Sequence, residues 1–189
     1  MKELVNFIME AGMLKRSPRS GWAVVGVKGA ESVAEHSFRC AVIGYLLARR
    51  EKADAYRVLL MTLFGDIHEA RMTDLHKMAH TYIDVQGAED RAFADQISSL
   101  KGQLKDEMAD MRAEYRAQET RESIIARDAD ILECLIQARE YAQQGFVQAA
   151  KFTVRAPGFL KTKSALSLWR QAKTADLNEW WTKVTRFER

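Results

Sequence analysis

Apolar residues recur every three or four positions along most of the chain, the spacing that puts them on one face of an α-helix. After a first helix near the N-terminus, this spacing predicts helices over residues 32–50, 58–76, 88–99, 103–116 and 119–144, and two short helices near the C-terminus. No stretch of useful length alternates apolar and polar residues as a β-strand would. The pattern therefore predicts an all-α bundle. The first stripe consists of Leu4, Phe7, Ile8, Ala11 and Leu14.

Helix boundaries are marked by capping residues. Ser32 and Glu35 have the spacing of a capping box, and Asp54 is a candidate N-cap for the next helix. Gly145 is placed to end the helix that starts near residue 119. In the C-terminal section, Trp169 and the pair Trp180-Trp181 are expected to be packing anchors.

The central predicted helix, residues 58–76, changes character along its length. Its first half is apolar nearly all the way round, as in a helix at the centre of a bundle. Its second half carries Asp66, His68, Glu69, Asp74 and His76. Burying carboxylates without partners is costly, so a bound cation would explain this arrangement. The alternative is an ordinary helix end whose acidic side chains face water.

Composition bounds the class of protein. With 189 residues, 47% of them hydrophobic and 29% charged, the chain is expected to form one globular domain rather than a disordered segment. No apolar run reaches the roughly 18 residues that span a bilayer, and no signal peptide is recognised. Cys40 and Cys134 fall in apolar patterns and are expected to be core residues. A cytoplasmic protein without membrane contact is the expectation.

Charge is distributed unevenly along the chain. Residues 1–50 carry 8 basic and 4 acidic side chains, residues 51–150 carry 12 and 19, and residues 151–189 carry 9 and 3. An acidic middle between basic ends suits a cation site beside a phosphate-attracting rim. The basic residues form no recognisable groove-reading motif, so nucleic acid is not an expected partner.

Several other side chains are candidates for binding. Arg19 and Trp22 lie in a basic loop that could hold a phosphate and a sugar or base; alternatively, Trp22 is a core anchor and Arg19 is solvated. His36 falls on the inward side of the second predicted helix, where a lone histidine is more often a hydrogen-bonded core residue than a ligand. His76 and His80 have the i, i+4 spacing of a metal-binding pair, although Lys77 stands where zinc proteases have Glu.

The separated motifs together resemble a known family. His36 in the segment ESVAEH, Asp66 in the central helix and Asp130 in the segment ADILE look like the first, third and fourth metal ligands of HD-domain phosphohydrolases. The chain is more narrowly similar to the HD-domain 5′-deoxynucleotidase group. Glu69 and Asp74 lie three and eight positions after Asp66, as do that group's catalytic and sugar-contacting acids. The resemblance covers about residues 4–145.

The resemblance implies a fold and an assembly. It implies a single all-α HD domain over residues 1–189, with the motifs in residues 4–145 and C-terminal helices over 160–187 packing on them. It also implies a homodimer.

In the helix predicted over residues 119–144, Asp128 looks more exposed in the sequence pattern than Asp130, which lies among apolar residues.

The resemblance also implies a chemistry. His36, Asp66 and Asp130 would hold a divalent cation such as Mn²⁺, Mg²⁺, Co²⁺ or another transition metal. The substrate would be a deoxyribonucleoside 5′-monophosphate, which is hydrolysed to deoxynucleoside and phosphate. Glu69 and Asp74 would be the catalytic acids, the first protonating the leaving oxygen and the second binding the 3′-hydroxyl. Arg19 and Trp22 would bind the phosphate and the sugar; the group's usual arginine directly before the tryptophan is Gly21 here.

One position departs from the family pattern. The family is named for an adjacent His-Asp pair, and this chain has Gly65 before Asp66. His68 is a candidate replacement ligand, but on a regular helix it lies about 160° from Asp66, against about 60° for Glu69. His68 would reach the site only if the helix unwinds after Gly65. The favoured expectation is that His68 is not a ligand and that Gly65→His restores one.

Two alternatives remain open at this point. Gly65 favours a degenerate HD domain that binds a nucleotide or a partner without efficient turnover. A hydrolase of signalling nucleotides is the second alternative. The chain lacks a Gly-Tyr-Pro motif, however, and Glu69-Ala70 stands where alarmone hydrolases have an acidic pair.

Overall fold

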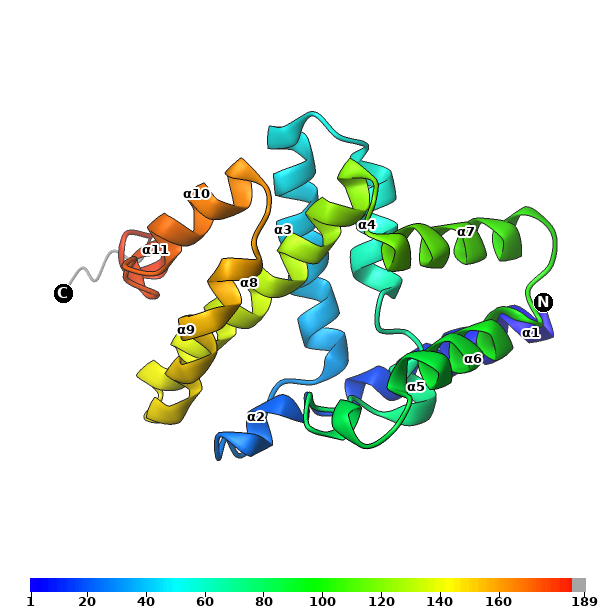
Figure 1. The fold of residues 1–189 in the computed structure, drawn as a ribbon, viewed down its shortest axis with the longest axis horizontal. Coiled ribbons are helices and arrows are strands. Elements are labelled where there is room, and N and C mark those ends of the chain that lie inside the picture. The colour runs from blue at the N-terminus through cyan, green and yellow to red at the C-terminus, as the bar shows by residue number, and fades with distance from the viewer. Residues whose placement is uncertain (185–189) are drawn as a thin grey trace.

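A computed structural model describes residues 1–184 of the chain. Within these residues the chain forms helices and no strand, so the predicted all-α class is confirmed (Figure 1). Residues 185–187, the end of the predicted C-terminal helices, lie outside the described residues. The α-helices are α1 (Lys2–Ala11), α2 (Gly21–Val24), α3 (Val33–Glu51), α4 (Ala55–Phe64), α5 (Glu69–Met72), α6 (Val85–Ile97), α7 (Gln103–Ala117), α8 (Arg121–Gln143), α9 (Phe152–Arg155), α10 (Lys163–Ala172) and α11 (Glu179–Thr182). The 3₁₀ turns are η1 (Gly12–Lys15), η2 (Ala79–Thr81), η3 (Val147–Lys151) and η4 (Ala156–Phe159).

The predicted helix caps are present. Ser32 accepts a hydrogen bond from the backbone N–H of Glu35, whose carboxylate accepts from the Ser32 N–H, so α3 begins with a capping box. Asp54 accepts from two backbone N–H groups at the start of α4. Gly145, with a φ of 103°, lies just beyond the end of α8. These local signals fix where the long helices begin and end.

The core is built around α3, α4 and α8, which pack against one another (Figure 1). From α8, Ile125, Leu132 and Leu135 are completely buried, and Leu47 of α3 lies in the same cluster. Burying a leucine or isoleucine side chain stabilises the fold by roughly 1.5–3 kcal/mol. Two long, well-packed helices therefore run past the place where the candidate site forms.

The predicted central helix does not continue to residue 76. It ends at Phe64, and the next residues form tight turns in which Ile67 N–H bonds Phe64 C=O at 3.2 Å and Glu69 N–H bonds Asp66 C=O at 3.0 Å. The physical reason is Gly65, a poor helix former, together with side chains that bind the freed carbonyls. Arg112 donates to the Gly65 carbonyl at 3.0 Å, and a second side chain, that of Gln96, binds the Ile67 carbonyl at the same distance.

Asp128 is buried, contrary to the sequence prediction. Only 1% of it is exposed, and its carboxylate accepts hydrogen bonds from the backbone N–H groups of Lys161 at 2.9 Å and Thr162 at 2.7 Å. The periodicity of α8 alone cannot reveal this, because the donors come from a segment more than thirty residues later. Asp128 thus attaches the start of α10 to α8.

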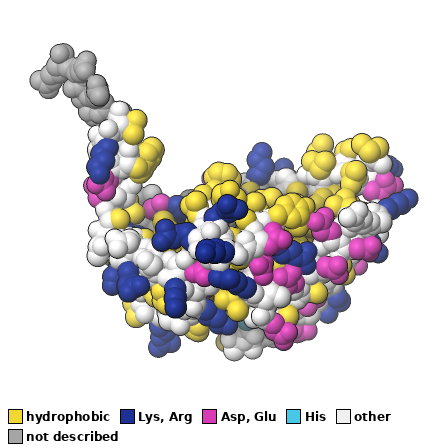
Figure 2. Space-filling model, turned by 90° about the horizontal axis from the view of Figure 1, so that it is seen from above, with side chains coloured by type: hydrophobic (Ala, Val, Ile, Leu, Met, Phe, Trp, Pro, Cys, Tyr) yellow, Lys and Arg dark blue, Asp and Glu magenta, His cyan; other side chains and the backbone are white. Residues whose placement is uncertain are grey.

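The C-terminal section is only partly anchored as predicted. Trp169 is buried in α10, which packs against α8 and α3. Trp180 is instead 74% exposed, so its expected role as a packing anchor is wrong. Basic side chains predominate on the side of the C-terminal segment in Figure 2 and acidic ones on the opposite side, while hydrophobic side chains gather along the upper edge of this view. No helix in the described part of the chain is long and apolar enough to cross a membrane.

Candidate active site

Three predicted metal ligands meet where α3, α8 and the turn after α4 approach one another. His36 is 1% exposed near the start of α3. Its Nε2 atom lies 3.3 Å from Oδ1 of Asp130 on α8 and 3.5 Å from Oδ2 of Asp66 in the turn. Spacings of this size between donor atoms are compatible with ligands that share one cation.

A buried carboxylate holds His36 in this orientation. Glu133 is fully buried on α8, and its Oε2 atom lies 2.5 Å from Nδ1 of His36. Arg39 donates to the other oxygen of Glu133 at 2.7 and 2.9 Å. A partner on Nδ1 leaves Nε2 for a ligand, as is usual for metal-binding histidines. Sequence reasoning missed Glu133 and Arg39. Each follows a predicted ligand by three positions, so each returns to nearly the same helix face.

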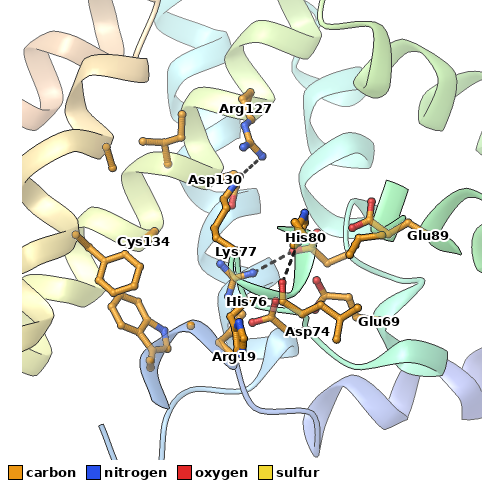
Figure 3. Close-up of a pocket in the computed structure, with 18 of the residues that line it drawn as sticks. Arg19, Glu69, Asp74, His76, Lys77, His80, Glu89, Arg127, Asp130 and Cys134 are labelled. Carbon is orange, nitrogen blue, oxygen red and sulfur yellow. Dashed lines mark hydrogen bonds and ion pairs between the residues drawn. The ribbon is translucent and has the colours of Figure 1, made fainter. Parts of the chain in front are cut away.

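The donor set fits a hard or borderline divalent cation, with one imidazole and two carboxylates. Within residues 1–184, His36, Cys40 and Glu133 also form a group whose donor atoms all lie within 4.8 Å of one another. Glu133 is already neutralised by Arg39, so the Nε2 side of His36, between the aspartates, is the better candidate for a cation. Each aspartate is paired with an arginine in the structure: Asp66 with Arg19, and Asp130 with Arg127, the second pair being visible in Figure 3.

Two further acids face the same space. Glu69 is 9% exposed, and its Oε2 atom is buried without a hydrogen-bond partner. Burial and the nearby Asp66 and Asp74 carboxylates raise the pKa of Glu69 to about 10, so the side chain holds a proton at neutral pH. Asp74 is held in place by the backbone N–H of Ser20, which donates to Oδ2 at 2.6 Å. The site thus contains a buried proton donor and a fixed acceptor.

The basic loop contributes one cation and one indole. Arg19 lies 3.6 Å from Asp66, and its side chain is 18% exposed, so it is not a solvated surface residue. Trp22 is 2% exposed, and its Nε1–H donates to Glu31 at 2.9 Å. The indole packs against the rings of Tyr141 and Phe152, with centroids 5.1 and 4.7 Å away. Trp22 is therefore both a core anchor and part of the pocket wall.

His68 makes contacts away from the three predicted ligands. It is 3% exposed, with Nδ1 3.4 Å from Nη1 of Arg112 and Nε2 3.8 Å from Oε1 of Glu89. These partners belong to α7 and α6. His76 and His80 both line the pocket, but they do not share a helix face, because the chain between them is helical only in the short η2 turn. The Nε2 atom of His80 lies 3.1 Å from the Leu75 carbonyl.

These side chains surround a pocket of about 550 Å³, a volume suited to a small ligand. Arg127 and Asp130 enter it from α8, while Arg19, Glu69 and Asp74 lie on the facing side (Figure 3). Its lining also includes the apolar residues Ile131, Phe152, Ala156 and Phe159. A lining that combines charged groups with apolar and aromatic side chains suits a ligand that has an anionic group and a ring.

Comparison with known proteins agrees with this picture. Residues 11–166 match the family model of the HD domain. The 5′-deoxynucleotidase HDDC2 of Xenopus laevis is 28% identical over 184 residues, covering 93% of this chain and 91% of that protein. A conserved hypothetical protein of Pyrococcus furiosus has a TM-score of 0.75 and 30% identity, covering 89% of this chain and 96% of that one. A predicted metal-dependent phosphohydrolase of Magnetospirillum magnetotacticum has a TM-score of 0.69 and 25% identity, covering 91% and 90%.

A helical bundle with a His–Asp–Asp cluster beside a buried glutamic acid defines the class: a metal-dependent phosphohydrolase, and hence an enzyme that uses a divalent metal. The chain belongs to the HD-domain family, and its relatives include the HD-domain 5′-deoxynucleotidase group that the sequence motifs indicated.

Proposed function

We propose that the protein is a 5′-deoxynucleotidase that hydrolyses deoxyribonucleoside 5′-monophosphates to deoxynucleoside and phosphate. The observation that carries the proposal is the convergence of His36, Asp66 and Asp130 beside the buried Glu69, in a pocket that also contains Asp74. The relatives named 5′-deoxynucleotidase support the same substrate class.

The residues divide the reaction between them. His36, Asp66 and Asp130 would hold the divalent cation, which supplies Lewis acidity toward the phosphate and a nucleophile at neutral pH. The attacking water gives up one proton to solvent as its oxygen forms the new bond to phosphorus, and the bond from phosphorus to the 5′-oxygen breaks. Glu69 gives its proton to that leaving oxygen, a role that needs the raised pKa of a buried acid. Arg19 binds the phosphate through charge-assisted hydrogen bonds.

The sugar would be selected by two side chains. Asp74, fixed by the Ser20 N–H, accepts a hydrogen bond from the 3′-hydroxyl. Trp22 is held by Glu31 and by neighbouring rings, so it cannot move aside for a larger sugar. It therefore crowds the 2′ position and disfavours ribonucleotides.

We further propose that the enzyme is a homodimer. The support is an apolar stripe along α3 that is exposed in the single chain: Phe38 is 69% exposed, and Val42, Tyr45 and Leu46 are 44–51% exposed. These residues recur at helical spacing, so they lie on one face. A second copy that covered this face would bury them.

Deoxy selectivity tests the proposed substrate. A pocket that crowds out one hydroxyl discriminates by about 1–3 kcal/mol, which corresponds to roughly 5- to 150-fold in kcat/KM. We expect a ratio in this range for dCMP over CMP with the Mn²⁺-loaded enzyme, and a smaller ratio for Trp22→Leu. Equal kcat/KM values for the two nucleotides, or a preference for CMP, would contradict the proposal.

A further inference from the structure

The space beside Gly65 is bounded by an aromatic ring. A Cβ atom built on Gly65 would lie 3.7 Å from Cε1 of Tyr115 on α7. This is the side of the site from which a family histidine at position 65 would extend. In this chain the side chain that faces the position is therefore a phenol and not an imidazole.

Tyr115 is linked to the metal-ligand cluster through one cation. Its hydroxyl lies close to the guanidinium of Arg127, and burial raises the pKa of Tyr115 well above its ordinary value, so it stays neutral. Arg127 in turn donates from Nη1 to Oδ2 of Asp130 at 2.7 Å. Gly65, Tyr115, Arg127 and Asp130 thus form one continuous line of contacts along the edge of the site.

Arg127 retains donors for a ligand. A guanidinium has five N–H donors in a planar fork, which matches the oxygens of a phosphate. One bond to Asp130 and one contact with Tyr115 leave further donors, while the side chain is 45% exposed and lines the pocket (Figure 3). On the other side of the cluster, Arg19 stands beside Asp66. Two guanidiniums therefore flank the pair of carboxylates.

We propose that Arg127 is a second phosphate-binding residue, which Tyr115 holds beside Asp130 at the edge of the site where this chain lacks the family histidine. The substrate phosphate would then be bound by two guanidinium groups, that of Arg19 near Asp66 and that of Arg127 near Asp130. This proposal rests on the proposed function in one respect, namely that the bound anion is the phosphate of the substrate.

A competing explanation makes a different prediction. If Arg127 only neutralises Asp130, its removal frees that carboxylate for the cation. Cation affinity would then rise, and phosphate affinity would stay the same. If Arg127 binds phosphate, its removal weakens phosphate binding at saturating cation.

The test measures inorganic phosphate binding by calorimetry, using the full chain saturated with Mn²⁺. Losing hydrogen bonds to a charged group should weaken phosphate binding about 10- to 100-fold in Arg127→Gln. Arg127→Lys should retain part of the affinity, because the charge remains while the fork is lost. Tyr115→Phe, which removes only the hydroxyl beside the Arg127 guanidinium, should weaken binding about 3- to 10-fold.

The matched control is Arg121→Gln on the same helix. Arg121 is 55% exposed and pairs with Glu51, and it does not line the pocket, so phosphate affinity should stay within about twofold of the parent. Unchanged phosphate affinity in both Arg127→Gln and Arg127→Lys would overturn the proposal. Deoxycytidine, which has no phosphate, should bind the parent and Arg127→Gln equally well.

The two proposals fail in distinguishable ways. A parent enzyme that hydrolyses dCMP while Arg127→Gln binds phosphate normally would overturn the role of Arg127 alone. A parent that does not hydrolyse dCMP, yet loses phosphate binding in Arg127→Gln, would overturn the proposed function and support the phosphate site.

Discussion

The site has two halves that are built differently. His36 and Asp130 project from α3 and α8, long helices whose backbone hydrogen bonds are regular and whose other faces are in the core. Asp66, Glu69 and Asp74 instead lie on tight turns and a single helical turn after α4. In the helical half, the backbone hydrogen bonds of α3 and α8 themselves fix the positions of His36 and Asp130. The turn half depends on side chains from elsewhere to satisfy its carbonyl groups.

We infer from this difference that the two halves of the site have separate roles. Helices fix the imidazole and one carboxylate, which need a constant geometry around a cation. The turns bring three acids to one side of the pocket. A regular helix could not do this, because the side chains of residues 66, 69 and 74 would point in different directions around its axis. We therefore expect mutations in the turn half to alter fold stability and the catalytic acids together, while mutations in the helical half alter mainly the cation.

The largest expected effect comes from Arg112, the main support of the turn half. Its side chain is 9% exposed, donates to the Gly65 carbonyl and pairs with Glu89 and Asp90. Arg112→Met leaves the Gly65 carbonyl without its donor and takes one of two arginine partners from each acid, so it should lower the free energy of unfolding by about 3 kcal/mol. Arg116→Met, one turn later and half-exposed, removes a pair with the same two acids and should cost under about 1 kcal/mol. Urea unfolding of both variants makes the comparison, and equal losses would contradict it.

Gly65 gives a smaller effect with a clear sign. A Cβ atom there would lie 2.7 Å from the Met61 carbonyl oxygen, so the backbone must shift. Gly65→Ala should therefore destabilise the protein by about 1–2 kcal/mol despite the gain in helix propensity. Gly12→Ala is the control, because φ is −60° and no atom lies within 4 Å; it should be neutral or slightly stabilising. Thermal melts that show the same change for both would contradict this explanation.

The same contact changes the expectation for Gly65→His. The prediction that Gly65→His restores a ligand requires position 65 to lie on a regular helix with space for an imidazole. The structure shows that any side chain there displaces the end of α4 and meets Tyr115. We therefore expect Gly65→His to lose stability, and a gain in Mn²⁺ affinity only if the turn rearranges.

A further effect is a pH dependence at Glu31, in the loop before α3. Burial and the nearby Glu133 carboxylate raise the pKa of Glu31 from 4.5 to about 7. Between these values the native state keeps a proton that the unfolded state has released, so stability falls as pH rises through this window. Glu31→Gln keeps an acceptor for Trp22 and removes the titration. Its stability relative to the parent should increase from pH 5 to pH 7 and level off above that. Parallel stability curves would contradict the assignment.

The sequence predicted the helical half far better than the turn half. The capping box and the apolar periodicity of α3 and α8 predicted which way His36 and Asp130 face, because a regular helix makes direction a function of spacing. Where α4 ends could not be predicted in the same way. The turns after Gly65 are stabilised by Arg112 and Gln96, which are 47 and 29 residues away from the carbonyls they bind.

Long-range contacts explain the other differences as well. Asp128 was predicted to be exposed, and it is buried because the start of α10 supplies two backbone donors. In the sequence, Glu133 looks like an ordinary helix residue. Only the structure shows its contact with His36. In each case the decisive partner is distant in sequence, so the local pattern carries no signal for it.

The central claim is that His36, Asp66 and Asp130 hold one divalent cation without help from His68. A titration of Mn²⁺ into the parent, His68→Ala and Asp130→Asn tests it most directly. The account predicts one Mn²⁺ per chain in the parent and in His68→Ala, because the contacts of His68 are with Arg112 and Glu89. It predicts no retained Mn²⁺ in Asp130→Asn. Loss of Mn²⁺ from His68→Ala, with retention in Asp130→Asn, would contradict the account.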